Sequence, residues 1–256
     1  MKCIILAAGA STRMRPLTDD IPKCLLHVGG KTILQRTIEL VSSAGVERIG
    51  IVLGYKAEAV RRFVKQHFPS HRIRLMDNPK YESTNNAFSL LLAREFFMNE
   101  ARRNAPLQGL LLLDSDIIFS PDLLPFLLKH DSPNRIAVRV QGEHDQEEIQ
   151  VQVDGDKNIV MIGKTALPGE TFGESIGIEV FSPSATQELF ETVERRVRSG
   201  SGRTEFYEAS FQEMIDNGVQ IRAVDTSRFP AVEIDTLEDL EVAENVIVPR
   251  IELAGR

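Results

Sequence analysis

Aromatic residues and cysteines are scarce in this sequence of 256 residues, which has no tryptophan, three tyrosines and two cysteines. Neither cysteine belongs to a CxxC pair, so a disulfide framework and a cysteine-rich zinc site are both excluded as the basis of the fold. Cys3 and Cys24 instead lie in apolar stretches. We expect them to be reduced core residues of a cytoplasmic protein.

Long apolar runs and an excess of positive charge are also missing. No stretch approaches the roughly 18 apolar residues of a membrane-spanning helix, and the apolar N-terminal stretch meets Gly9 too early for a signal peptide. The net charge is −7 and the pI about 5.4, which argues against nucleic acid as a partner. We therefore expect neither a membrane nor a nucleic acid partner, and a homodimer is compatible with this composition.

Two well-known phosphate-binding motifs are absent as well. A P-loop ending at Gly30-Lys31-Thr32 would require glycine at position 25, which is leucine. A dinucleotide motif starting at Gly9 would require glycine at positions 11 and 14, which are serine and methionine. The sequence thus argues against a P-loop enzyme and against a nicotinamide-dependent dehydrogenase.

Short apolar runs alternate with segments of helical spacing through the first half of the chain. This alternation predicts βαβ units around a mainly parallel sheet. The predicted strands are 2–7, 47–53, 72–76 and 109–114, and the predicted helices are 32–44, 56–67, 85–98 and 121–129.

Beyond residue 135 the strands become shorter, with turn signals between them, which predicts a small antiparallel addition to the main sheet. No internal repeat or long linker divides the chain, so we predict one α/β domain over residues 1–256. The strands predicted here are 135–140, 149–153, 158–163, 173–181, 219–224 and 231–235, and the helices are 183–198, 205–216 and 236–247.

A loop that carries several cations follows the first predicted strand. In an open parallel sheet, ligands bind beyond the carboxyl ends of strands, and Gly9 at such an end lets the backbone approach a ligand closely. Ser11 and Thr12 add small hydrogen-bond donors. Arg13 can hold a phosphate with its planar guanidinium, and Lys23 is a compact positive charge. The loop therefore predicts an anion site, with an exposed loop of incidental arginines as the alternative.

The segment from Leu6 to Leu26, LAAGASTRMRPLTDDIPKCLL, closely resembles the signature of nucleotidyltransferases that join a nucleoside triphosphate to a sugar phosphate or a small alcohol phosphate. Every element of their pattern is present: Leu-Ala-Ala-Gly-x-Ser-x-Arg, Pro-Leu-Thr and Pro-Lys. The resemblance implies a Rossmann-like, glycosyltransferase-A-like α/β fold. It also implies that the glycine-rich backbone and the arginine hold the triphosphate, while the lysine neutralises charge near the α-phosphate. The residues of this nucleotide site are Leu6, Ala7, Ala8, Gly9, Ser11, Thr12, Arg13 and Lys23.

Carboxylates follow two of the predicted strands. Asp114 and Asp116 end the strand at 109–114, and Asp235 ends a late one. Carboxylates beside a triphosphate suggest an intervening cation, and Mg²⁺ binds one or two carboxylates together with phosphate oxygens. Each aspartate has a structural alternative, a turn or a helix cap. The resemblance implies that Asp116 and Asp235 together hold Mg²⁺, with Asp114 beside the nucleotide.

The segment after the third predicted strand, NPKYESTNNAFSL, offers donors and acceptors for a base or a ribose, although Ser83 or Thr84 could simply cap the next helix. This segment resembles the cytidylyltransferases that act on phosphocholine, 2-aminoethylphosphonate and inositol phosphate. FGESIGI, TEFYE and EIDTLEDL occur later in the order found in that group. The resemblance adds Asn78, Ser83, Thr84 and Asn85 to the nucleotide site.

Four glutamates are expected to border the far side of the crevice, where they would suit an ammonium group better than a phosphate. They are Glu174, Glu205, Glu208 and Glu233. An aromatic cage for choline would have to rely on residues such as Tyr81 and Tyr207, because tryptophan is absent. We assign Glu174, Tyr207, Glu208 and Glu233 to the acceptor. A polyol bound by hydrogen bonds and simple surface solvation of the glutamates are the alternatives.

Together these features predict an Mg²⁺-dependent cytidylyltransferase that joins CTP to a small phosphorylated alcohol or phosphonate. The nucleotide would bind to residues 1–130, approximately, and the acceptor to residues 131–256. Lys23, Arg13, Asp116 and Asp235 would be the catalytic residues. A sugar-1-phosphate nucleotidyltransferase and a non-catalytic nucleotide-binding regulator are the rival interpretations.

Overall fold

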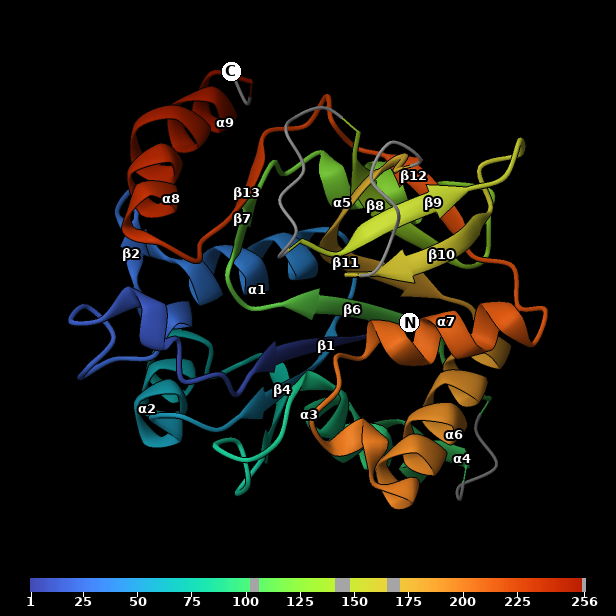
Figure 1. Cartoon of the computed structure of the whole chain (residues 1–256). Helices are drawn as coiled ribbons and strands as arrows, with labels where there is room; N and C mark the ends of the chain where they lie inside the picture. Colours follow the sequence, from blue (N-terminus) through green and yellow to red (C-terminus); the bar gives the residue numbers. More distant parts are fainter. Residues whose placement is uncertain (102–105, 141–147, 165–170, 255–256) are drawn as a thin grey trace.

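The structure is a computed structural model, and it describes residues 1–101, 106–140, 148–164 and 171–254. Its centre is a nine-stranded mixed sheet with the strand order β10-β9-β11-β6-β1-β4-β5, in which β8 pairs with β11 and β12 (Figure 1). These strands are β1 (Lys2–Ala7), β4 (Arg48–Leu53), β5 (Arg72–Asp77), β6 (Leu110–Asp114), β8 (Arg135–Arg139), β9 (Gln150–Val153), β10 (Ile159–Gly163), β11 (Gly173–Phe181) and β12 (Arg222–Asp225).

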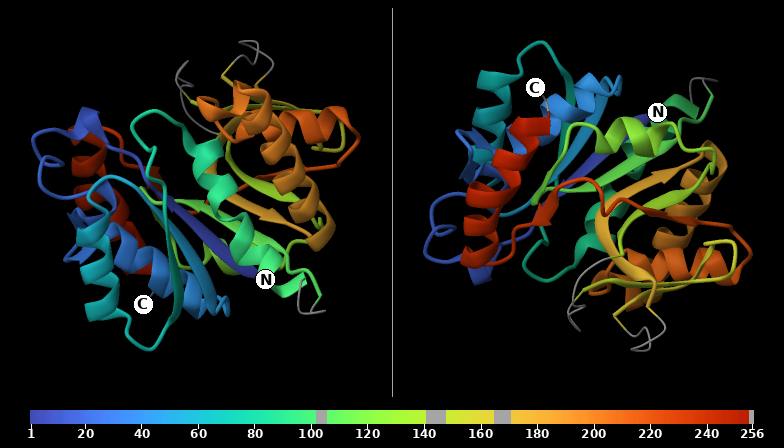
Figure 2. Two further views of the ribbon diagram at one scale, coloured as in Figure 1. Left: turned by 90° about the horizontal axis from the view of Figure 1, so that it is seen from below. Right: turned by 90° about the horizontal axis from the view of Figure 1, so that it is seen from above.

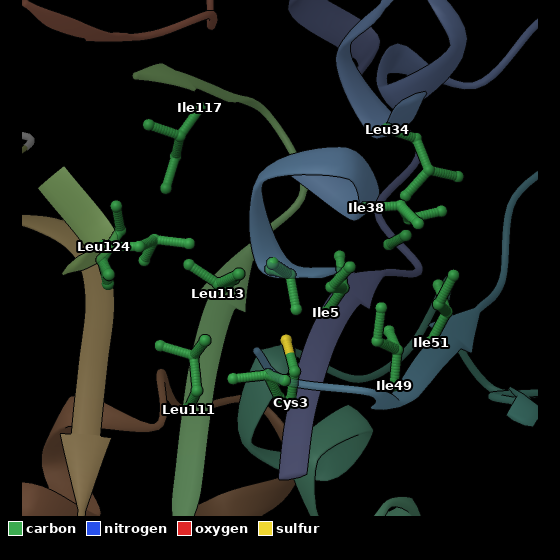
Figure 3. Close-up of a cluster of buried hydrophobic side chains, with 14 of the residues drawn as sticks. Cys3, Ile5, Leu34, Ile38, Ile49, Ile51, Leu111, Leu113, Ile117 and Leu124 are labelled. Carbon is green, nitrogen blue, oxygen red and sulfur yellow. The ribbon is translucent and has the colours of Figure 1, made fainter. Parts of the chain in front are cut away.

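Helices cover both faces of this sheet, which explains why the interior positions of its central strands β1, β4 and β6 are free of charged residues on both faces. Side chains of β1 alternate between the faces. Cys3 and Ile5 pack in one buried cluster, whereas Ile4 and Leu6 pack in another. In Figure 3, Cys3 and Ile5 lie beside side chains of β4 and β6, facing Leu34 of the first helix.

Each cluster is completed by its own set of helices. On the Cys3 face these are α1 (Ile33–Ser43), α2 (Ala57–His67) and α5 (Leu123–Leu128), and on the Ile4 face α3 (Asn86–Leu92), α4 (Arg94–Ala101), α6 (Pro183–Ser199) and α7 (Glu208–Asp216). The predicted α/β fold with a mainly parallel mixed sheet is confirmed.

The antiparallel strands do not form a separate layer on the main sheet. Instead β11 pairs directly with β6 and with β8 and β9, so the sheet continues from its parallel part into the antiparallel part. The amino end of β11 therefore lies in the same sheet as the carboxyl end of β6, and both reach the crevice edge.

Two short sheets lie outside the main one. In one, β7 (Ile117–Phe119) pairs with β13 (Ala231–Glu233), and in the other β2 (His27–Val28) pairs with β3 (Lys31–Thr32). The strand at 231–235 was predicted, but its partner β7 and the strands β2 and β3 were not, because they are too short to show an apolar period of two. The first of these sheets matters for the site, because it joins the middle and the late parts of the chain.

The closing helix starts as predicted but runs further than residue 247. It consists of α8 (Leu237–Val242), a π-helical turn (Ala243–Ile247) and α9 (Val248–Ala254). Figure 2 shows it beside the N-terminal loops, at the opposite end of the molecule from α6 and α7. Its apolar face shares a third buried cluster with Met14, Ile118 and Ile234. None of the helices in the described ranges is long and apolar enough to cross a membrane.

Candidate functional site

A cavity of about 780 Å³ lies at the carboxyl ends of β1 and β6, within the usual range of roughly 300–1,000 Å³ for ligand sites. It brings together nearly all of the residues that the sequence assigned to a site. Those lining it are Leu6, Ala7, Ala8, Gly9, Ser11, Thr12, Arg13, Lys23, Asn78, Thr84, Asn85, Asp114, Asp116, Glu174, Glu208, Glu233 and Asp235.

The loop after β1 is held by contacts on both sides of its cations. Ser11 adopts a left-handed conformation with φ 48°, and its carbonyl accepts a hydrogen bond of 2.9 Å from the Thr18 hydroxyl. Met14, next to Arg13, is fully buried in the third cluster. Tyr55 donates its hydroxyl to the Thr18 carbonyl at 2.8 Å. The loop is therefore anchored, which limits the entropy lost when a ligand binds.

The pairing of β7 with β13 brings the two predicted metal ligands together. Asp116 directly precedes β7, and its carbonyl accepts a 3.0 Å hydrogen bond from the Ile234 N–H. Asp235 follows β13 and is fixed by the helix beyond it, because Asp239 accepts its N–H at 3.0 Å. Thr236 and Asp239 form a capping box at the start of α8. The helix cap in this region is therefore Thr236, and Asp235 directly precedes it.

Lys23 lies between the two aspartates. Its Nζ is 2.6 Å from Asp116 Oδ2 and 2.7 Å from Asp235 Oδ1, and Arg13 Nη2 lies 2.7 Å from the other Asp235 oxygen. Burial alone would lower the pKa of Lys23, but the two carboxylates raise it above its usual value. Burial opposes ionisation of Asp235 in turn, yet Lys23 and Arg13 lower its pKa. Lys23 and Asp235 are therefore both charged at neutral pH.

The same place fits a divalent cation. Asp116, Glu233 and Asp235 each offer a carboxylate oxygen, and these oxygens lie within 4.8 Å of one another. Asp116 Oδ1 is buried and has no hydrogen-bond partner among the described residues. A cation bound there would satisfy this oxygen. The sequence assigned Glu233 to the acceptor, and the structure places it beside the two aspartates as well.

The segment between β5 and α3 is built around Asn78. Its buried amide donates to Thr84 Oγ1 at 3.1 Å and to Ser89 Oγ at 3.0 Å, so Asn78 positions this wall of the cavity. Asn85 caps α3 by accepting the Asn86 N–H. Ser83 does not line the cavity, because its hydroxyl is turned back to the Lys80 carbonyl.

The structure corrects the prediction that Tyr207 contacts the acceptor. It is fully buried and does not line the cavity. Its hydroxyl donates to Asp114 Oδ2 at 2.9 Å and its N–H donates to Asn86 Oδ1 at 2.8 Å. Tyr207 therefore connects the start of α7 to β6 and α3 from behind the cavity wall. Burial, followed by the charges of Asp116 and Glu208, raises the pKa of Asp114.

Glu205 is a second correction, because it pairs with Arg196 at 2.8 Å instead of bordering the cavity. Glu174 and Glu208 do border it. Glu174 pairs with Arg139, and burial together with Glu148 raises its pKa to about 8. Glu208 is 4% exposed, and burial raises its pKa to about 8 too.

Several lining residues were missed by the sequence reasoning. Arg139 ends β8, Glu148 precedes β9, and Lys164 follows β10. All three are charged residues at strand ends, and that position was the available signal. The short antiparallel strands gave no indication that these ends meet at the crevice, because the strand order that places them there, with β8 and β9 paired to β11 and β10 paired to β9, is set by tertiary contacts.

Comparison with known proteins agrees with this geometry. Residues 2–151 match the sequence pattern of the family described as "Nucleotidyl transferase". The chain is similar to the CTP:phosphoglutamine cytidylyltransferase of Campylobacter jejuni, with 28% identity over 94% of this chain and 98% of that protein. It is 39% identical to the choline-phosphate cytidylyltransferase of Streptococcus pneumoniae over 39% of this chain and 42% of that protein.

A solved structure has the same fold. The inositol-1-phosphate CTP transferase from T. maritima superimposes with a TM-score of 0.78, and the match covers 98% of this chain and 96% of that one. The sequence identity is 22%, so this likeness shows the fold alone.

The charge pairing around Lys23 generates a prediction about stability. Lys23→Met removes the cation between Asp116 and Asp235 and leaves Arg13 as the cation beside Asp235 alone. This should lower the free energy of unfolding by roughly 3 kcal/mol. Mg²⁺ should restore part of the loss, because a divalent cation can replace the ammonium. Urea denaturation with and without Mg²⁺ measures both effects. Lys31→Met, which removes an exposed pair with Glu39, is the matched control and should cost less than about 1 kcal/mol. Equal losses in the two variants would contradict the assignment.

The buried carboxyl of Glu208 generates a prediction about pH. Its pKa is raised to about 8 in the folded protein, so its contribution to stability is fully present below the unfolded-state pKa of about 4.3 and is lost as the pH rises through 8. Glu208→Gln should therefore stabilise the ligand-free protein at pH 8.5, by up to about 4 kcal/mol, and change little at pH 5. Denaturation at both pH values is the measurement. Glu191→Gln on α6 is the exposed control, and a pH-independent effect of Glu208→Gln would refute this account.

Proposed function

Because the chain belongs to the nucleotidyl transferase family, we propose that it transfers a cytidylyl group from CTP to a small phosphorylated alcohol or phosphonate, in a Mg²⁺-dependent reaction that releases pyrophosphate. The acceptor is of the phosphocholine or 2-aminoethylphosphonate type. The chain acts as one domain, with the nucleotide bound by residues 1–130, approximately, and the acceptor by residues 131–256. The two free, buried cysteines support a cytoplasmic location.

The observation that carries the proposal is the convergence of two cations and three carboxylates at one end of the cavity. Arg13 and Lys23 come from the loop after β1, and each pairs with Asp235 at 2.7 Å. A triphosphate entering past Gly9 meets these two cations first. When phosphate oxygens bind Arg13 and Lys23, the carboxylates that now pair with these cations are free to bind a metal ion.

The nucleophile in this reaction needs no general base. A phosphate monoester or phosphonate has a second pKa near 6, so its attacking oxygen is already anionic at neutral pH. This oxygen bonds to the α-phosphorus of CTP as the bond to the β-phosphate oxygen breaks, and pyrophosphate leaves. The protein therefore acts by positioning and by charge neutralisation.

The proposed roles of the individual residues are those that the family resemblance implies, and their positions in the cavity support them. Lys23 neutralises charge at the α-phosphate, and the more exposed Arg13 holds the departing phosphates. Asp116 and Asp235, with Glu233 beside them, would hold Mg²⁺. When bound, the metal supplies further neutralisation of the triphosphate oxygens.

The far side of the cavity supports an acceptor with a positive group. Glu208 lines it, and such a carboxylate favours an ammonium over a neutral sugar. The choice of CTP is supported by the names of the similar proteins and by the polar wall around Thr84 and Asn85. Measuring pyrophosphate release across CTP, ATP, GTP and UTP, with phosphocholine, 2-aminoethylphosphonate and glucose 1-phosphate, tests these two preferences. Turnover only with glucose 1-phosphate would favour a sugar nucleotidyltransferase. No turnover with any combination of nucleotide and acceptor would favour a binding protein.

A variant of Asp116 tests the reaction centre itself. Asp116→Ala should lower kcat for pyrophosphate release by at least 10²–10³-fold, on the order of the loss of one key charge contact, while the far-UV circular dichroism stays native. Asp131→Ala replaces an exposed aspartate beyond α5 and should leave kcat unchanged. Near-normal turnover of Asp116→Ala would exclude it from the metal site.

A further inference from the structure

The far side of the cavity carries charges that the transfer reaction does not use. We call this surface the acceptor wall, and it is built from the ends of β8, β10 and β11 and from the start of α7. Its members are Arg139, Lys164, Glu174, Phe206 and Glu208. Arg139 and Glu174 are already paired with each other, and Glu148, which also lines the cavity, interacts with Glu174. Glu208 and Lys164 are therefore the two ionisable groups that the wall offers to a ligand.

Glu208 supplies the acidic group. Burial raises its pKa to about 8 in the ligand-free protein, and an ammonium bound beside it would favour the anionic form. It is the first residue of α7 and is 4% exposed, yet it lines the cavity. Its Oε2 has no hydrogen-bond partner among the described residues. A buried carboxylate oxygen without a donor is costly, and a ligand ammonium would satisfy it.

Lys164 is the cation. It follows β10 and makes no ion pair within the described ranges, while its Nζ lies 4.8 Å from the centre of the Phe206 ring. Gln212 of α7 holds β10 against this helix, because its side chain accepts the Ile162 N–H at 2.8 Å and donates to the Val160 carbonyl at 3.2 Å. The end of β10 that carries Lys164 is thereby kept close to the start of α7, where Glu208 lies. Of the cations that line the cavity in the described part of the chain, Arg13, Lys23 and Arg139 are paired with carboxylates and Lys164 is not.

The order of the strands places Lys164 away from the reaction centre. Glu233 lies with Asp116 and Asp235. Lys164 directly follows β10, and in the strand order of the sheet β9 and β11 lie between β10 and β6, the strand that Asp116 follows. A group bound by Lys164 is therefore separated by two strands from the end of β6, where the phosphate reacts.

We propose that the acceptor is an amino-acid-like phosphate or phosphonate, whose ammonium group binds Glu208 and whose carboxylate binds Lys164. This inference rests on the proposed function and narrows its acceptor. A carboxylate fits better than a second phosphate, because Lys164 supplies a single charge and the neighbouring Glu208 would repel a dianion. The apolar stem of such an acceptor can lie along Phe206.

Matched acceptors isolate the carboxylate. O-phosphoserine and phosphoethanolamine differ only in that group, and O-phosphohomoserine and 3-aminopropyl phosphate repeat the comparison with one more methylene. With CTP and Mg²⁺, the wild-type kcat/KM should be at least 10-fold higher for the amino acid in one of the pairs. Lys164→Met should bring this ratio close to one, and Lys164→Arg should retain most of it. Glu208→Gln should lower kcat/KM for both members, since both carry the ammonium group.

The outcomes separate this inference from the function on which it rests. Lys129→Met, an exposed lysine at the end of α5, is the control and should leave the ratio at its wild-type value. Turnover of phosphoethanolamine with a ratio near one in the wild type, or an equal loss for both members in Lys164→Met, overturns the amino-acid-like acceptor and leaves the cytidylyltransferase intact. The equal loss would mean that Lys164 holds the reacting phosphate. No pyrophosphate release with any acceptor overturns both.

Discussion

The site depends on one ammonium group. Lys23 is buried between Asp116 and Asp235, which come from distant parts of the sequence and would repel each other without it. A buried ion pair is a weak source of stability, but removing one partner is expensive. Lys23 thus holds the two carboxylates together in this structure. In the reaction that we propose, it would bind phosphate oxygens instead when a metal ion binds the carboxylates.

The fold supplies this arrangement through its short elements more than through its large sheet. The nine-stranded sheet places the β1 loop and the end of β6 at one edge. The pairing of β7 with β13 then brings Asp235 to Asp116, and the third buried cluster holds Met14 of the loop against the same strands and the closing helix. Nucleotide loop, metal ligands and C-terminal helix therefore form one connected unit.

The sequence predicted those residues of the candidate site that belong to local sequence motifs. The glycine at a strand end, the cations of the loop and the aspartates after β6 and β13 could all be found, and the family resemblance gave them roles. Long-range pairing could not be read in the same way. Nothing local distinguishes Tyr207, which is buried behind Asp114, from an acceptor contact, or shows that Glu205 turns to Arg196. Lys164 and Arg139 were missed because β10 and β8, the strands that carry them, reach the crevice only through tertiary pairing, β10 with β9 and β8 with β11.

The central claim is that Lys23, Asp116 and Asp235 form a joint site for a metal ion and a triphosphate. Calorimetric titration of CTP into the wild-type protein, once with Mg²⁺ and once with EDTA, tests it most directly. With a metal between the carboxylates and the phosphates, Mg²⁺ should raise the affinity for CTP at least about 10-fold, which corresponds to a coupling free energy of about 1.4 kcal/mol. The same affinity in both titrations would contradict the claim.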